Sequence, residues 1–335
     1  MAGLIVRRLL QLPLILLVIY TLTLTLAWAI PGNPLENPEG RQPPQEVIDQ
    51  MKAQYNLDNY WAFYTTYLDN ATGLKWMREK FDGTHAIDDQ MARDQGLAPR
   101  VRYVFDLGPS LHYKDQRVNE IVAISLPVSI TLGALAMLIA LVVGLGAGVV
   151  GAVKPNSFAD ISTLVIALIG ISLPSFVIGT VLLIVFGVWT KVLPVGGWGS
   201  LSSFVLPAVT LSLPFAAYIA RLTRMGMIES LDADYIRTAR AKGVSNMNVL
   251  FKHALKNAFL PVLSFLGPAT ALAMTGSFVV ERVFNVPGIG QHFVNGVQNK
   301  DLFLIMGVVL IFATMLILFN LAVDVLYRWV DPRIE

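Results

Sequence analysis

The sequence predicts an all-α polytopic membrane protein, and three observations support that prediction. Hydrophobic residues make up 55 % of the 335-residue chain. Charged residues make up only 14 %, well below the roughly 25 % that is usual in soluble domains. The charges are also segregated, because they lie between long uncharged stretches. Several of these stretches exceed the length of about 18 residues at which a transmembrane helix is expected.

The uncharged stretches predict six membrane spans. The apolar stretch 9–30 is longer than the apolar region of a cleaved signal peptide, so we expect a retained helix. Pro127 is expected to separate a lead-in from the second span, and Pro174 to break the third. Turn residues at 194–197 delay the start of the fourth. The predicted spans are 9–30, 128–150, 161–190, 201–220, 258–280 and 302–323.

The distribution of Lys and Arg predicts the orientation. If the N-terminus is inside, the inner segments carry twelve basic residues and the short outer loops carry three. Cytoplasmic loops are enriched in Lys and Arg, so both termini are expected in the cytoplasm. We therefore expect three parts: an N-terminal transmembrane helix (1–30), an extracytoplasmic insertion (31–120) and a five-helix core (121–335) with a cytoplasmic loop at 221–257.

The predicted insertion at 31–120 has the composition of a folded segment. It has ten basic and fourteen acidic residues, and eleven aromatic ones, four of which cluster between positions 61 and 67. Val47, Met51 and Tyr55 recur every four residues, which is typical of one face of a helix. We expect a small helical insertion or cap and not a disordered linker.

Several function classes lack the residues that they need. The six predicted spans contain no Asp, Glu, Lys, Arg or His, whereas ion-coupled carriers usually keep an ionisable residue at membrane depth. No Gly-Lys dipeptide occurs, so a Walker A phosphate loop is absent. The chain has no Cys, and its four His are scattered over loops. No catalytic residue, metal site or cofactor site is predicted, and nucleic-acid binding is not expected.

The predicted spans contain small residues and prolines at positions that matter for packing. Gly144, Gly148 and Gly151 are spaced for close contact between two helices, and a hinge is the alternative interpretation. The prolines inside or beside the spans are structural kinks or kinks that line a conduit. They are Pro174, Pro207, Pro214, Pro261 and Pro268.

The loop at 221–257 is basic and helix-patterned. A short helix is expected to begin at Asp234 as its N-cap and to stop at Gly243, and a second to begin at Ser245. One interpretation is a helix lying on anionic lipid. The other is a projecting helix that presents Tyr235, Ile236 and Ala239 to a cytoplasmic partner.

The segment 235–243, Tyr-Ile-Arg-Thr-Ala-Arg-Ala-Lys-Gly, followed by Asn-Ala-Phe-Leu-Pro at 257–261, resembles the coupling ("EAA") loop of ABC importer permeases. Further matches indicate the oligopeptide/dipeptide/nickel branch and its B-type subunit. They are Pro-Gly-Asn-Pro at 31–34, Phe-Asp-Leu-Gly-Pro-Ser-Leu at 105–111, Glu-Arg-Val-Phe at 281–284 and Val-Asp-Pro-Arg at 330–333. Arg237 stands where the general motif has glutamate.

The resemblance implies an importer of type I architecture in which two permeases pair above two ATPases. The coupling role would belong to Tyr235, Ile236, Arg237, Thr238, Ala239, Arg240, Ala241, Lys242 and Gly243. The expected partners are a second, C-type permease, two ABC ATPase subunits and an extracytoplasmic peptide-binding protein, with membrane lipid around the spans. ATP and Mg would be bound by the ATPases and no cofactor by this chain. The location would be the plasma (inner) membrane of a prokaryote.

The resemblance also implies a second site, at which a loop meets the binding protein or acts as a gate. Its candidate residues are Glu281, Arg282, Phe284, Pro287, Gly288 and Gly290, for which plain loop folding is the alternative. Peptide import is the expected function. A nickel-chelate importer permease and an autonomous secondary carrier or channel remain open at this stage.

Overall fold

The computed structural model describes residues 2–35, 44–95, 101–113 and 115–330. It divides into two compact units. Unit 1 comprises Met1–Leu12, Ser125–Gln291 and Thr314–Glu335. Unit 2 comprises Pro13–Ile124 and His292–Ala313. The helices α1 (Ala2–Ala29), α6 (Val118–Val153), α14 (Ile289–Gln298) and α15 (Leu302–Val330) each contribute residues to both units.

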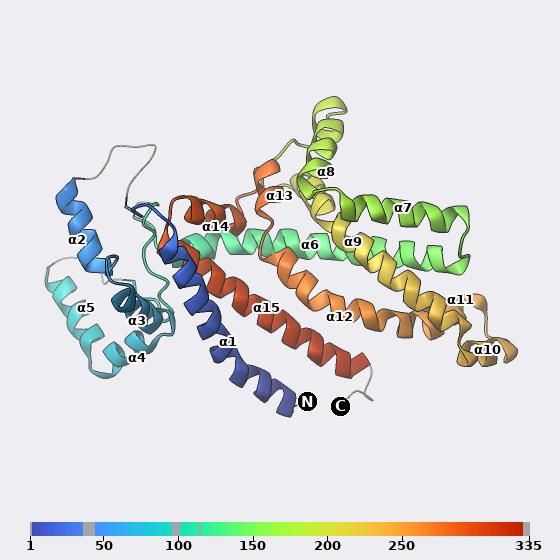
Figure 1. Cartoon of the computed structure of the whole chain (residues 1–335), viewed down its shortest axis with the longest axis horizontal. Helices are drawn as coiled ribbons and strands as arrows, with labels where there is room; N and C mark the ends of the chain where they lie inside the picture. Colours follow the sequence, from blue (N-terminus) through green and yellow to red (C-terminus); the bar gives the residue numbers. More distant parts are fainter. Residues whose placement is uncertain (1, 36–43, 96–100, 114, 331–335) are drawn as a thin grey trace. The chain divides into compact units, whose positions relative to one another are not determined.

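The regular elements of the described residues are helices, which confirms the predicted fold class. Five are long and apolar enough to cross a membrane, and a bent pair makes six if it is one span. That pair is α7 (Phe158–Ser172) and the segment Ser175–Trp189, which comprises α8 (Ser175–Leu182) and the π-helix η1 (Leu183–Trp189). The chain bends by 108° between the two halves, at a break that contains Pro174, as predicted for this proline (Figure 1).

Helix boundaries differ from the prediction in three places. Helix α6 continues through Pro127, because one proline removes a single backbone hydrogen bond and the apolar helix on both sides persists. Helix α9 (Leu201–Asp232) runs well beyond Ala220, so the first part of the predicted loop is helical. The fifth predicted span is two helices, α12 (Leu255–Met274) and α13 (Phe278–Val283), with Gly276 at φ +90° between them.

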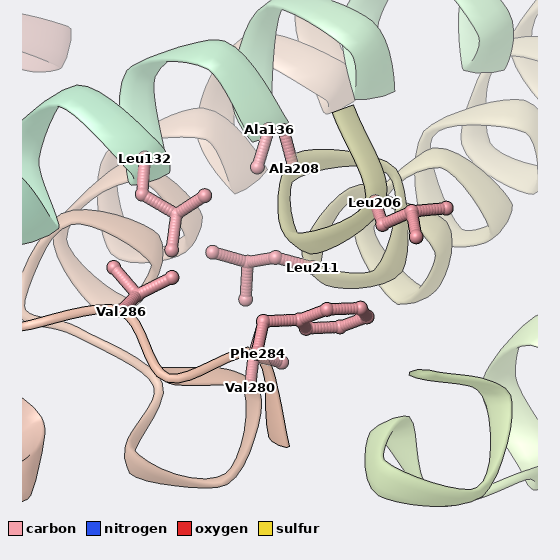
Figure 2. Packing of buried hydrophobic residues seen from close by; sticks show 8 residues of the cluster. All are labelled: Leu132, Ala136, Leu206, Ala208, Leu211, Val280, Phe284 and Val286. Carbon is pink, nitrogen blue, oxygen red and sulfur yellow. The ribbon is translucent and has the colours of Figure 1, made fainter. Parts of the chain in front are cut away.

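The interior of unit 1 is built around α6, α9 and α12. Figure 2 shows one cluster, which includes Leu132 of α6, Leu211 of α9 and Phe284 after α13. A Cβ at Gly144 would lie 2.7 Å from the Ala216 carbonyl oxygen of α9, and one at Gly148 would be 2.7 Å from that of Ala220. The two glycines therefore let α6 and α9 approach closely, as predicted.

The insertion, which the sequence predicted only as a small folded segment, contains four helices that belong to unit 2 (Figure 1). They are α2 (Gln45–Tyr55), α3 (Tyr60–Ala71), α4 (Leu74–Phe81) and α5 (Thr84–Asp94). Tyr67 stacks between Tyr20 of α1 and Phe63, with ring centroids 5.8 Å apart in both pairs. In α2 the buried residue is Ile48, one position after the predicted Val47, which is exposed.

Candidate functional site

The predicted coupling segment forms helix α10 (Asp234–Ala241), and Gly243 ends it. Gly243 has φ +77°, and its amide donates to the Arg240 carbonyl at 3.0 Å. The Val244 amide donates to the Ala239 carbonyl at 3.2 Å. These two bonds are the Schellman pattern, which requires a left-handed residue that glycine adopts without strain. The N-cap residue is Ala233 and not Asp234, which begins the helix and accepts no capping bond.

One face of α10 is buried in unit 1. Ile236 is fully buried and Ala239 nearly so. Ile236 packs in a cluster that includes Val149 of α6, Met227 of α9 and Ala258 of α12. The expectation that Ile236 and Ala239 face a cytoplasmic partner is therefore wrong. At three-residue spacing both fall on the apolar side of a short amphipathic helix, and burying that side is what holds the helix to the core.

The opposite face of α10 is exposed and basic. Tyr235 is 42 % exposed, and its hydroxyl accepts a hydrogen bond from Asn257 Nδ2 at 2.9 Å. Arg237 lies 3.3 Å from Asp234 in an exposed ion pair. The remaining exposed residues of the segment are Thr238, Arg240, Ala241, Lys242 and Gly243. The motif therefore presents its arginines and lysine outward and keeps its aliphatic residues for attachment.

The attachment of α10 reaches the long helices directly. After Gly243 comes the exposed α11 (Asn246–Asn248), and the chain re-enters the core in the π-helix η2 (Val249–Ala254), which leads into α12. Helices α9 and α12 approach closely beside it, since a Cβ at Gly226 would lie 2.9 Å from the Ala258 Cα. A displacement of α10 would therefore be transmitted to α6, α9 and α12 as packed bodies, because close-packed interiors transmit strain.

A buried ion pair lies near the same end of these helices. Arg224 of α9 contacts Asp160 of α7 through two bonds, Nε to Oδ1 at 2.5 Å and Nη2 to Oδ2 at 2.8 Å. Asp160 is 1 % exposed and also accepts the Asn156 amide at 2.8 Å. The sequence did not predict this pair because both residues lie just outside the predicted spans. The span 161–190 begins one residue after Asp160, and the span 201–220 ends four residues before Arg224. The real helices do carry ionisable residues.

Glu281 lies at the centre of the second predicted site. It is fully buried, and Ser129 of α6 donates to its Oε1 at 2.7 Å. The Gln291 amide donates to Oε2 at 3.3 Å, and the Ile289 amide donates to Ser129 Oγ at 2.9 Å. The carboxylate therefore joins α13, the first turn of α14 and α6 into one network of hydrogen bonds.

Three glycines surround this carboxylate. A Cβ at Gly276 would lie 2.6 Å from Glu281 Oε1, one at Gly290 would lie 2.9 Å from Oε2, and one at Gly288 would overlap the carboxyl group. Phe284 is also buried, whereas Arg282 and Pro287 are exposed. Glu281, Phe284, Gly288 and Gly290 therefore hold the loop together. A role of the loop as a gate or as a contact for a binding protein stays a prediction.

Unit 2 has its own buried carboxylate. Asp301 accepts hydrogen bonds from Ser110 Oγ at 2.5 Å and from the amides of Leu111 and Leu304 at 2.9 and 3.1 Å. Burial raises the pKa of Asp301, and the hydrogen bond from Ser110 partly offsets this by lowering the pKa. Among the described residues no group of three His, Cys, Asp or Glu side chains could hold a metal ion.

The family model described as "Binding-protein-dependent transport system inner membrane component" matches residues 140–335, more than half of the chain. The chain belongs to this family. It is 40 % identical over 338 residues to the oligopeptide transport system permease protein OppB of Salmonella typhimurium, and 39 % identical to that of Escherichia coli strain K12, with all of both chains covered. It is 36 % identical over 336 residues to the dipeptide transport system permease protein DppB of Bacillus subtilis, covering all of this chain and 98 % of that one.

These matches confirm the predicted family and its multi-pass inner-membrane location. The chain is a permease subunit of an ABC transport system and not its catalytic subunit. A component of a binding-protein-dependent system works with partner proteins, so the alternative of an autonomous carrier loses its support.

Proposed function

We propose that this permease forms one half of the pathway through which peptides enter the cell, and that a second, C-type permease forms the other half. An extracytoplasmic binding protein delivers the peptide. Support comes from full-length similarity to permeases of oligopeptide and dipeptide transport systems. The described residues hold no cluster of potential metal ligands, which favours a peptide over a bare nickel ion. A metal chelate is the second candidate cargo.

The observation that carries the proposal is the two-sided geometry of α10. One side is fixed among α6, α9 and α12, and the other leaves Arg237, Arg240 and Lys242 exposed. A short helix attached in this way suits docking on an ATPase subunit whose closure around ATP and Mg is a rigid-body movement. The whole segment Tyr235–Gly243 then transmits that movement to the spans. ATP and Mg are bound by the two ATPases and not by this chain.

The proposed orientation follows from this role. Helix α10 and both termini face the cytoplasm, and the four-helix insertion of unit 2 faces the other side together with the loop that contains Arg282 and Pro287. The excess of Lys and Arg on one side of the predicted spans supports this orientation. The exposed Arg282 and Pro287 are then the candidates for contact with the binding protein.

The proposal is tested by isolating the tagged chain from its host in mild detergent and identifying the proteins that accompany it. A second permease with two ATPases is expected, and the complex in proteoliposomes should take up a labelled tripeptide when binding protein and ATP are present. If the complex took up a nickel chelate and no peptide, the chelate would replace the peptide as the assigned substrate. Isolation of this chain alone in several mild detergents would contradict the proposal and favour a lipid-surface role for α10.

A further inference from the structure

Unit 2 contains a half-open cavity of about 350 Å³ between α3, α4, α5 and the segment 101–109. Its volume is at the lower end of the range of small-molecule sites. Aromatic side chains such as Trp76 and Tyr103 line it together with charged residues of both signs. More of the lining surface is polar than apolar, so the cavity suits a polar or charged ligand.

Two buried polar atoms around this cavity have no hydrogen-bond partner. Tyr67 is 2 % exposed and its hydroxyl is unpaired, and the buried Nε of Arg117 is also without a partner. Both residues line the cavity. Burial, followed by the charges of Tyr20 and Asp106, raises the pKa of Tyr67 well above its usual value, so its hydroxyl stays protonated and can donate. A buried polar group without a partner is costly, so a ligand that accepts these bonds would be stabilised.

The arginines of the lining are already paired, Arg117 with Asp106 and Arg102 with Asp89, whereas two of its carboxylates are incompletely paired. Glu79 lies 3.9 Å from Lys75 and 3.4 Å from His85, and Asp88 lies 3.5 Å from Arg102. These separations exceed those of ordinary hydrogen bonds, so the two carboxylates keep the capacity to accept from an ammonium group. Donors for a carboxylate and acceptors for an ammonium therefore line the same cavity.

We propose that this cavity binds a short zwitterionic peptide, with its carboxylate at Tyr67 and Arg117 and its ammonium at Glu79 and Asp88. Trp76 and Tyr103 supply apolar surface for the side chains of the peptide, while Lys80 and Arg117 already lie over their rings. The proposal rests on the proposed function for the choice of peptide among zwitterions. It adds a peptide site within unit 2.

The test measures trialanine binding by calorimetry to the complete permease–ATPase complex in nanodiscs, with neither binding protein nor nucleotide present. Tyr67→Phe removes only the unpaired hydroxyl, so the melting temperature should not fall while the affinity for trialanine falls about tenfold. Tyr60→Phe is the matched control, because Tyr60 belongs to the same aromatic group, bonds Thr25 and does not line the cavity. Trialanine blocked at both ends should bind much more weakly to the wild type.

The outcomes separate this proposal from the proposed function. Wild-type affinity in Tyr67→Phe, equal binding of the blocked peptide, or no binding to the wild type would each overturn the cavity assignment, whether or not ATP-driven peptide uptake proceeds. If the wild type binds no peptide and Tyr67→Phe instead weakens docking of the binding protein, the cavity is a protein contact. If uptake of every peptide fails while trialanine still binds with the expected pattern, the proposed function falls and the zwitterion site stands.

Discussion

Helix α10 and the segment 276–291 are both short, and both carry motif residues, but they are held in different ways. Helix α10 is attached through two aliphatic side chains, Ile236 and Ala239, and leaves its charged face exposed. The other segment is built around the buried carboxylate of Glu281, with glycines packed against it. Apolar attachment is non-directional and holds the helix by close packing, whereas a buried hydrogen-bond network specifies one arrangement of donors and acceptors. The first construction suits a moving contact and the second a fixed loop.

The largest effect should come from breaking the polar network. Glu281→Ala leaves Ser129 Oγ and the Gln291 amide without their acceptor, and we expect a loss of about 3 kcal/mol of stability. Thermal unfolding of the purified complex measures this loss. Arg282→Ala, at the exposed neighbour, should change stability by less than about 0.5 kcal/mol. Equal melting temperatures for the two variants would show that the network does not hold the loop.

An intermediate effect should come from loosening the apolar attachment of α10. Ile236→Ala leaves a cavity among Val149, Met227 and Ala258, which costs about 2–3 kcal/mol locally. Limited proteolysis near Gly243 should therefore accelerate, and uptake should fall more than ATP hydrolysis. Thr238→Ala, on the exposed face, is the control and should leave the cleavage rate unchanged. A cleavage rate in Ile236→Ala equal to that of the wild type would show that other contacts hold the helix.

A smaller effect should come from the stop at the end of α10. Gly243→Ala forces a Cβ into a left-handed conformation in open space, so only backbone strain of about 1 kcal/mol is expected. Gly146→Ala is a matched control, because Gly146 also faces open space but lies inside α6 and has no positive φ. It should lose no stability. A lower melting temperature for Gly146→Ala than for Gly243→Ala would contradict the assignment of strain to Gly243.

Features with a local signal could be predicted from the sequence. The six uncharged stretches, the break at Pro174, the stop at Gly243 and the glycine spacing at 144 and 148 all depend on neighbouring residues or on helical periodicity. The helical insertion also had its signal in the aromatic cluster and the four-residue periodicity.

Features that depend on partners far apart in the chain were missed. Asp160 and Arg224 are 64 residues apart, and Ser129 and Glu281 are 152 apart. No local pattern connects either pair. The prediction that Ile236 and Ala239 face a partner was wrong for a related reason. The sequence shows that the eight-residue helix α10 is amphipathic and buries one face. Only the position of the neighbouring helices decides whether that face packs against the core or against a partner. The cavity of unit 2 combines residues from several helices and could not be inferred from spacing.

We propose that the exposed basic face of α10 couples ATP hydrolysis to transport. The most direct measurement is the ratio of peptide taken up to ATP hydrolysed in proteoliposomes for the double variant Arg237→Glu/Arg240→Glu. Lys154→Glu, an exposed basic residue of the α6–α7 connection, controls for contact with anionic lipid. We predict a fall of about tenfold in this ratio for the double variant in assembled complexes, and none for the control. A wild-type ratio in the double variant, with the complex intact, would contradict the account.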